Sequence, residues 1–320
     1  MPEISKVAVL DDYQGVALTY ADWPSLPGNP QITVFQEPFA DPSAVVESLA
    51  PFDVVVAMRE RTRFPAEVLR RLPNLRLLVT TGMVNAAIDV AAARELGVTV
   101  TGTRSAGQPT VELTWALILA LARHIPAEDQ RIRDGGWQST VGADLGGQRL
   151  GVIGLGRIGS AVAHIGVAFG MDVMAWSANL DPKHARSLGT TPVSKDELLA
   201  AADVVTVHLK LSERSQGLIG ERELALMKPT ALLINSSRGP IIDEDALLRA
   251  LHENRIGGAG LDVYATEPLP ADSPWRTAPR TVLTPHLGYV SDKTYTTFFS
   301  DAVEDIRAFA ADRPVREISE

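Results

Sequence analysis

The stretch Leu150-Gly151-Val152-Ile153-Gly154-Leu155-Gly156-Arg157-Ile158-Gly159 decides how this chain folds. Its first four residues are an apolar run typical of a buried strand, and a helical pattern follows the last residue. Gly154 allows a tight turn, Gly156 lets a diphosphate approach the backbone, and Gly159 lets helix and strand pack closely. The N–H groups and positive dipole of the helix start would hold that diphosphate. The spacing therefore predicts a dinucleotide site, with contacts from Gly154, Gly156, Arg157, Ile158 and Gly159.

The next strand, predicted at Asp172–Trp176, leaves the identity of the dinucleotide open. An Asp normally follows such a strand and binds the ribose hydroxyls, but Ser177 stands there. An Asp would repel the 2′-phosphate of NADP, whereas Ser177 and Asn179 would not. No Arg stands beside Ser177, although Lys183 and Arg186 lie further along the chain. We therefore expect either NAD or NADP, with Ser177 and Asn179 among the cofactor contacts.

Short apolar runs alternate with helical patterns on both sides of this stretch, as in parallel α/β proteins. The second half predicts strands near 150–153, 172–176, 204–207, 231–235, 260–263 and 281–283. The first hundred residues predict strands near 7–10, 53–58, 75–80 and 98–101, with helices near 66–71 and 88–96. Six parallel strands joined by crossovers fit a doubly wound nucleotide-binding sheet. The expected fold is therefore two Rossmann-like or flavodoxin-like doubly wound parallel-sheet domains with an interdomain cleft.

Composition narrows the chemistry and the partners. The 320 residues include no cysteine, which excludes thiolate nucleophiles, zinc–thiolate sites and iron–sulfur clusters, and no metal site is predicted. The formal charge of −9 disfavours nucleic acid, and Arg59, Arg61 and Arg63 form the only basic cluster. The longest apolar run, 115–122, is far short of the ~20 residues that span a membrane. With no signal segment before the first strand, we expect a cytoplasmic protein.

Three later segments carry candidate catalytic residues, each just after a predicted strand, where such sheets bind ligands. Arg238 could bind a carboxylate bidentately, although most Arg side chains are simply solvated. Asp262 and Glu267 could equally be loop-capping carboxylates, and a lone His such as His286 is more often structural. The other five histidines are expected to be structural, although His208 could line the cofactor groove.

Four segments resemble the D-isomer-specific 2-hydroxyacid dehydrogenases, in that family's order: 135–163, 235–245, 262–268 and 284–288. The resemblance implies hydride transfer between NAD(P)H and a 2-keto acid or D-2-hydroxy acid. Arg238 would hold the substrate carboxylate and keto oxygen, and His286 would be the acid in reduction and the base in oxidation. Glu267 would fix the His286 ring and favour its protonated form. The further cofactor contacts would be His208, Ser236 and Asp262, the last at the nicotinamide carboxamide.

The same resemblance implies a split organisation of the chain. Residues 1–103 and 291–320 would form the substrate domain, and residues 104–290 the dinucleotide-binding domain. The segment Thr81-Gly82-Met83-Val84 would offer backbone N–H groups to the substrate carboxylate, with Gly82 permitting its close approach. The segment 58–62 would be a second cleft loop, although a charged surface turn fits it equally well.

Two departures from the family pattern bear on the sites. Lys210 stands where many relatives have Pro, and Tyr289 stands where a small residue is usual. Because Tyr289 lies three residues from His286, we expect it to narrow or line the substrate entrance. The helix predicted from Thr110 to His124 and the segment around Trp137 are apolar enough to indicate a homodimer.

Alternative functions remain open on the sequence alone. A nucleotide-sensing interaction protein of corepressor type could keep the same fold, but it would not need an Arg–Glu–His set. Formate as the donor is disfavoured, because relatives that use it have Gln where Thr284 stands, and phosphite has no positive support. The particular 2-hydroxy acid is not identified.

Overall fold

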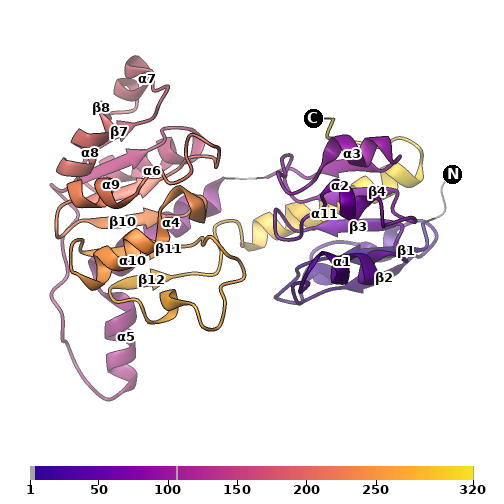
Figure 1. The fold of residues 1–320 in the computed structure, drawn as a ribbon, viewed down its shortest axis with the longest axis horizontal. Helices are drawn as coiled ribbons and strands as arrows, with labels where there is room; N and C mark the ends of the chain where they lie inside the picture. Colours follow the sequence, from indigo (N-terminus) through magenta and orange to yellow (C-terminus); the bar gives the residue numbers. More distant parts are fainter. Residues whose placement is uncertain (1–3, 106, 320) are drawn as a thin grey trace. The chain divides into compact units, whose positions relative to one another are not determined.

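The computed structural model describes residues 4–105 and 107–319, and the chain divides into two compact units (Figure 1). Unit 1 comprises Met1–Ala106 with Ser291–Glu320, and unit 2 comprises Gly107–Val290. Each unit contains one sheet in which every pairing is parallel. The predicted fold class, two doubly wound parallel-sheet domains, is confirmed.

Unit 1 has a five-stranded sheet in the order β2-β1-β3-β4-β5, the flavodoxin-like order. Its strands are β1 Lys6–Val9, β2 Gln31–Val34, β3 Val54–Ala57, β4 Leu77–Thr80 and β5 Thr99–Gly102. Its α-helices are α1 Pro42–Leu49, α2 Ala66–Leu69, α3 Val90–Glu95 and α11 Asp292–Ala310, with short 3₁₀ turns at Ala17–Thr19 and Trp23–Ser25. The central strands β3 and β4 are buried throughout, as their predominantly apolar sequences predicted.

Helix α11 completes the core of unit 1 from the far end of the chain. It packs against β4 and β5, and Phe298, Phe299 and Ile306 are fully buried. The tail after it returns to the sheet, because the Ile318 N–H donates to the Val100 carbonyl at 2.9 Å. Residues from the two chain ends thus share one hydrophobic core.

Two buried aspartates of α11 bind arginines from the segment after β5 and from the tail after α11. The Arg104 guanidinium donates to both carboxylate oxygens of Asp301 at 3.0 and 2.6 Å. Arg316 Nη2 lies 2.8 Å from Asp305 Oδ1, and Asp305 is fully buried. Burial raises the pKa of Asp305 to about 7 even though the Arg316 charge opposes that shift.

Unit 2 has a seven-stranded sheet in the order β12-β11-β10-β9-β6-β7-β8. Its strands are β6 Arg149–Ile153, β7 Asp172–Trp176, β8 Thr191–Pro192, β9 Val204–Val207, β10 Leu232–Asn235, β11 Gly258–Leu261 and β12 Thr281–Leu283. Its α-helices are α4 Gln108–Ala122, α5 Ile125–Arg133, α6 Arg157–Ala168, α7 Pro182–Ser187, α8 Lys195–Ala201, α9 Glu221–Leu226 and α10 Glu244–His252, with 3₁₀ turns at Gly239–Ile241 and Pro274–Thr277. The chain reverses direction across the sheet between β6 and β9, and such a switch point is where doubly wound sheets bind ligands.

Helix α4 and the segment after it differ in burial. The predicted apolar helix is α4, but much of its apolar surface, including Trp115 and Ile118, is buried within unit 2 itself. Helix α5 and the residues up to 144 extend away from the rest of unit 2 (Figure 1). Trp137 is 71% exposed and Val141 is 94% exposed there. The exposed apolar surface therefore lies mainly after α4 rather than on it.

Two further properties concern the described ranges 4–105 and 107–319. None of their helices is long and apolar enough to cross a membrane. Within the same ranges, no group of three or more His, Asp or Glu side chains is arranged to hold a metal ion.

Candidate active site

The site in unit 2 centres on His286 and Glu267. His286 Nδ1 lies 2.6 Å from Glu267 Oε2, and the other carboxylate oxygen accepts the Tyr264 N–H at 2.9 Å. Burial by itself would raise the pKa of Glu267, but the hydrogen bond and charge of His286, with smaller contributions that include the Arg238 charge, lower it overall. A charged Glu267 therefore fixes one ring nitrogen of His286 and leaves Nε2 for a ligand.

The turn that carries His286 is held by Asp262, which directly follows β11. Asp262 is completely buried, and its Oδ1 accepts the Thr284 hydroxyl at 2.6 Å and the Leu287 N–H at 2.7 Å. Its Oδ2 accepts the Gly288 N–H at 2.8 Å, and its backbone carbonyl accepts the His286 N–H at 2.8 Å. His286 itself adopts the left-handed conformation with φ 55°. Asp262 thus braces a strained turn, whereas a contact with the nicotinamide carboxamide stays a prediction.

Arg238 follows β10 in a turn fixed by hydrogen bonds. Asn235 Nδ2 donates to the Arg238 carbonyl at 2.9 Å, and Asn235 Oδ1 accepts the Ser237 N–H at 3.0 Å. Ser237 Oγ donates to the last carbonyl of β9 at 2.6 Å. The half-buried Arg238 side chain donates from Nη1 to the Ser237 carbonyl at 2.8 Å. The Arg238 charge also helps to lower the pKa of Glu267, so Arg238 lies near enough to the His–Glu pair to influence it.

Two residues that the sequence did not single out bring these turns together. A Cβ atom on Gly239 would lie only 2.1 Å from the Tyr264 carbonyl carbon, so the turn after Arg238 passes tightly against the turn before Glu267. The Tyr264 hydroxyl donates to the Thr284 carbonyl at 3.1 Å and so links that turn to the His286 turn. Burial raises the pKa of Tyr264. The only signal in the sequence was a Gly directly after Arg238 and a Tyr three residues before Glu267.

The glycine turn between β6 and α6 has the geometry that a dinucleotide needs. Gly154 has φ 97°, and its N–H donates to the Trp176 carbonyl at 2.8 Å. A Cβ on Gly159 would lie 1.9 Å from the Gly154 carbonyl oxygen, so only glycine fits there. A Cβ on Gly156 would instead meet open space, directly before the first residue of α6, Arg157. The turn therefore offers a diphosphate an open approach to the free N–H groups of a twelve-residue helix.

Other predicted cofactor contacts lie around the same edge of the sheet. His208 follows β9 and bonds through Nε2 to Thr206 Oγ1 at 2.9 Å. Burial lowers the pKa of His208 to about 3, so this ring is neutral at physiological pH. Ser236 is buried, and its hydroxyl bonds to Thr114 Oγ1 at 2.8 Å.

In unit 1, the predicted substrate loop follows β4 with some of its N–H groups already in use. The Thr81 N–H donates to the last carbonyl of β3 at 3.0 Å, and the Gly82 N–H donates to Thr103 Oγ1 at 2.8 Å. The N–H groups of Met83 and Val84 donate to no residue within the described part of the chain, and both residues are exposed. If this loop binds a carboxylate, Met83 and Val84 are its available donors.

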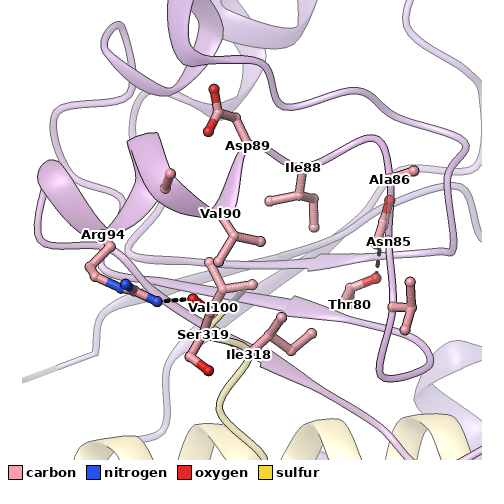
Figure 2. Close-up of a pocket in the computed structure, with 12 residues that line it drawn as sticks. Thr80, Asn85, Ala86, Ile88, Asp89, Val90, Arg94, Val100, Ile318 and Ser319 are labelled. Carbon is pink, nitrogen blue, oxygen red and sulfur yellow. Dashed lines mark hydrogen bonds between the residues drawn. The ribbon is translucent and has the colours of Figure 1, made fainter.

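Arg59 holds that loop in place from the neighbouring strand end. It adopts φ 53°, its N–H donates to Thr81 Oγ1 at 2.9 Å, and its Nη1 donates to the Thr81 carbonyl at 3.1 Å. A Cβ on Gly82 would lie 2.0 Å from Arg59 Nη1, so the guanidinium lies directly over Gly82. Asn85 Nδ2 donates to the Arg59 carbonyl at 2.6 Å. It also donates to Thr80 Oγ1 at 2.8 Å (Figure 2).

A hollow of about 570 Å³ lies beside the same loop in unit 1 (Figure 2). Apolar side chains such as Ile88, Val90 and Val100 form much of its lining, and Arg94 donates to the Ser319 carbonyl at its margin. None of the predicted catalytic or cofactor-contacting side chains lines it. The hollow therefore borders the predicted substrate loop at Val84 and is separate from the predicted catalytic side chains.

Tyr289 lies beside the catalytic candidate His286. The two rings meet edge to face, with centroids 5.6 Å apart and an interplanar angle of 70°. Tyr289 is only 9% exposed. The structure thus places this ring against the His286 imidazole, and its predicted effect on the substrate entrance stays a prediction.

A glycine turn at a switch point, with a His–Glu pair and an Arg at neighbouring strand ends, defines a dinucleotide-dependent oxidoreductase. Residues 115–288 match the NAD-binding domain of the D-isomer-specific 2-hydroxyacid dehydrogenases. The chain is 38% identical over 258 residues to a glyoxylate reductase of Aeropyrum pernix, covering 78% of this chain and 77% of that protein. It is 30% identical over 328 residues to a hydroxypyruvate reductase of Blautia hydrogenotrophica, covering 98% and 99%. A phosphoglycerate oxidoreductase structure from Vibrio cholerae superposes with a TM-score of 0.91 at 35% identity, covering 97% of this chain and 100% of that one.

The chain belongs to the D-isomer-specific 2-hydroxyacid dehydrogenase family. It is an oxidoreductase that transfers a hydride between a nicotinamide cofactor and a 2-keto acid or D-2-hydroxy acid. The predicted family and reaction class are confirmed, and the alternative of a nucleotide-sensing interaction protein receives no support from these relatives.

Proposed function

We propose that Arg238, Glu267 and His286 carry out the reduction of a 2-keto acid. The Arg238 guanidinium binds the substrate carboxylate and polarises the keto carbonyl. His286 gives the proton on Nε2 to the keto oxygen as the carbonyl becomes a hydroxyl, and it takes that proton back in the oxidation direction. Glu267 keeps the ring oriented through Nδ1 and stabilises its protonated form.

The observation that carries this proposal is the 2.6 Å contact between His286 Nδ1 and a Glu267 carboxylate whose pKa is lowered. A structural histidine would need only a neutral acceptor. Here a charged, half-buried acid is kept against the ring with an Arg nearby, which suits a group that alternates between protonated and neutral forms.

When bound, the nicotinamide cofactor supplies or accepts the hydride. The turn between β6 and α6 would hold its diphosphate through the helix N–H groups, and the open space beside Gly156 fits that role. Among the residues proposed to contact the cofactor, the side chains of Ser236 and Asp262 are buried and the other side chains are at least partly exposed. The proposed cofactor contacts are Gly154, Gly156, Arg157, Ile158, Gly159, Ser177, Asn179, His208, Ser236 and Asp262.

We propose a short 2-keto acid of the size of glyoxylate or hydroxypyruvate as the substrate. Relatives with these substrates in their names support it. The Tyr289 ring, packed on His286, would limit the space beside the reacting carbon. The substrate carboxylate would also bind at the loop Thr81-Gly82-Met83-Val84, where the N–H groups of Met83 and Val84 are the available donors because those of Thr81 and Gly82 already donate within unit 1.

The proposal is tested by steady-state reduction of glyoxylate, hydroxypyruvate, pyruvate and 3-phosphohydroxypyruvate with NADH and NADPH. His286→Gln should lower kcat about 10²- to 10⁴-fold with little change in cofactor binding. Arg238→Ala should also raise KM. His252→Gln is the matched control, because His252 lies on α10 and should leave the kinetics unchanged. Parallel loss of cofactor binding and turnover in the His286 variant would point to a structural role instead.

We also propose that the protein is a cytoplasmic homodimer. The exposed Ile132, Trp137 and Val141 lie on α5 and the segment after it, and covering them would bury apolar area. A native mass measurement should give two chains, and Trp137→Asp should shift the mass toward one chain. A single-chain mass for the unmodified protein at micromolar concentration would contradict the dimer.

A further inference from the structure

The carboxyl ends of β7 and β9 lie on either side of the glycine turn. Gly154 donates its N–H to the Trp176 carbonyl at 2.8 Å, directly before Ser177. On its other side, a Cβ on Gly154 would lie 2.5 Å from the His208 carbonyl oxygen, two residues before Lys210. With β6 between them, β7 and β9 are separated by about 10 Å, twice the ordinary strand spacing. Residues after both strands can therefore reach one adenosine ribose.

The two residues at the β7 end of this edge that were predicted to contact the cofactor, Ser177 and Asn179, are neutral and do not repel a phosphate. Ser177 Oγ and the Asn179 side chain make no hydrogen bond with any residue that the structure describes. The only acid between residues 177 and 190 is Asp181, and its carboxylate already accepts the Lys183 N–H at 2.9 Å as the cap of α7. The polar groups nearest to the end of β7 are thus neutral and available.

The β9 side adds positive charge. Lys210 is exposed, and its backbone is fixed because its carbonyl accepts the Ser215 hydroxyl at 2.7 Å. Lys183, Arg186, Lys210 and Arg214 follow these two strands and form no ion pair within the described residues. Glu213 is the one acid in the loop 209–217. A chain with a net charge of −9 therefore keeps unpaired cations at this edge.

We propose that Lys210 is the counter-ion for the 2′-phosphate of NADP(H), with Ser177 and Asn179 as its hydrogen-bond donors, so that the enzyme prefers NADP(H) to NAD(H). This inference rests on the proposed dinucleotide site. A cation stabilises a bound phosphate, and Ser177 in place of the usual Asp removes the negative charge that would repel the 2′-phosphate. Lys210 thus determines cofactor specificity from the end of β9, whereas the residue that normally does so follows β7, on the other side of β6.

The test is equilibrium binding of NADPH and NADH, followed by cofactor fluorescence without substrate. The unmodified protein should bind NADPH more tightly than NADH. Lys210→Ala should weaken NADPH binding about 10- to 100-fold and leave NADH within twofold, since only one of the two carries the phosphate. Ser177→Asp should reverse the preference. Lys293→Ala, an exposed lysine on α11 of unit 1, is the control for loss of one positive charge and should change neither affinity.

The outcomes separate this inference from the function on which it rests. Tighter NADH binding by the unmodified protein, or equal weakening of both cofactors in Lys210→Ala, would overturn the role of Lys210 and leave the dehydrogenase intact. Failure of the unmodified protein to bind either cofactor would overturn the proposed dinucleotide site itself. A fall in NADPH affinity with added salt that is lost in Lys210→Ala would support the charge-based mechanism.

Discussion

Replacing Asp262 with Asn separates two roles for this residue, a contact with the nicotinamide carboxamide and a brace for the His286 turn. The amide can still accept hydrogen bonds at the Oδ1 position from Thr284 and Leu287. At the Oδ2 position, however, an NH₂ group would face the Gly288 N–H, which is now 2.8 Å from an accepting oxygen. The substitution keeps the shape of the side chain and breaks one buried, charge-assisted hydrogen bond.

The magnitude follows from these contacts. A hydrogen bond to a charged group contributes about 1.5–3 kcal/mol, and the two remaining bonds become weaker once the acceptor is neutral. Burial raises the pKa of Asp262, so the ion is costly to bury and the neutral amide recovers part of the loss. The expected destabilisation is about 2–4 kcal/mol, which lowers Tm by roughly 5–15 °C in a domain of this size.

Thermal unfolding, cofactor titration and steady-state kinetics of Asp262→Asn decide between the two roles. As a brace, Asp262 should affect Tm and kcat, with kcat at least tenfold lower because His286 is displaced, while cofactor affinity changes less than threefold. An unchanged Tm together with a large loss of cofactor affinity would refute the brace. Asp272→Asn is the matched control, since Asp272 is an exposed aspartate of the same unit.

Four other substitutions test three separate parts of the structure. Glu267→Gln should lower the rate of reduction about 10²-fold or more at neutral pH. Because the pKa of Glu267 is lowered from 4.5, the unmodified enzyme should keep the Glu267–His286 ion pair above pH 4.5 and lose it only at more acidic pH, as a pH–rate profile would show. Gly159→Ala should unfold or rearrange the turn after β6, whereas Gly156→Ala should keep its Tm and weaken dinucleotide binding, because only the first new Cβ meets protein atoms. The pKa of Asp305 is raised to about 7, so the folded state holds this proton more tightly than the unfolded state, and the unmodified protein should lose up to about 4 kcal/mol of unfolding free energy as pH rises from about 4 to 7. In Asp305→Asn this pH-dependent loss should be absent, which urea unfolding at pH 4 and pH 8 would measure.

The parts of the fold that the sequence predicted well are those with strong local signals. Strands β3, β4 and β9 consist almost entirely of Val, Leu and Ala, with one Thr each in β4 and β9, because both of their faces are buried. The strand β2 was missed because it is a half-exposed edge strand whose residues alternate in character, and β8 was missed because it has only two residues. Unit 2 therefore has seven strands where the sequence predicted six, and β8 is the additional one.

The candidate site was predictable only as far as its motifs are local. The glycine spacing and the strand-end positions of Arg238, Glu267 and His286 can be read along the chain. The bonds that bring the turns together, through Asp262 and Tyr264, join residues about twenty positions apart. No local pattern encodes such pairs, because they depend on the register of β11 and β12. For the same reason, the sequence does not show that the Thr81 and Gly82 N–H groups already donate hydrogen bonds within unit 1.

The composition of unit 1 from both chain ends imposes an order on biosynthesis. The residues 107–290 are contiguous and can form their sheet while the ribosome is still translating the last helix. The N-terminal strands are made first, yet the surfaces of β4 and β5 that α11 covers stay exposed until Phe298, Phe299 and Ile306 emerge. The unit that starts the chain is thus the last to be completed, and during that interval its apolar surface is open to chaperones and to aggregation.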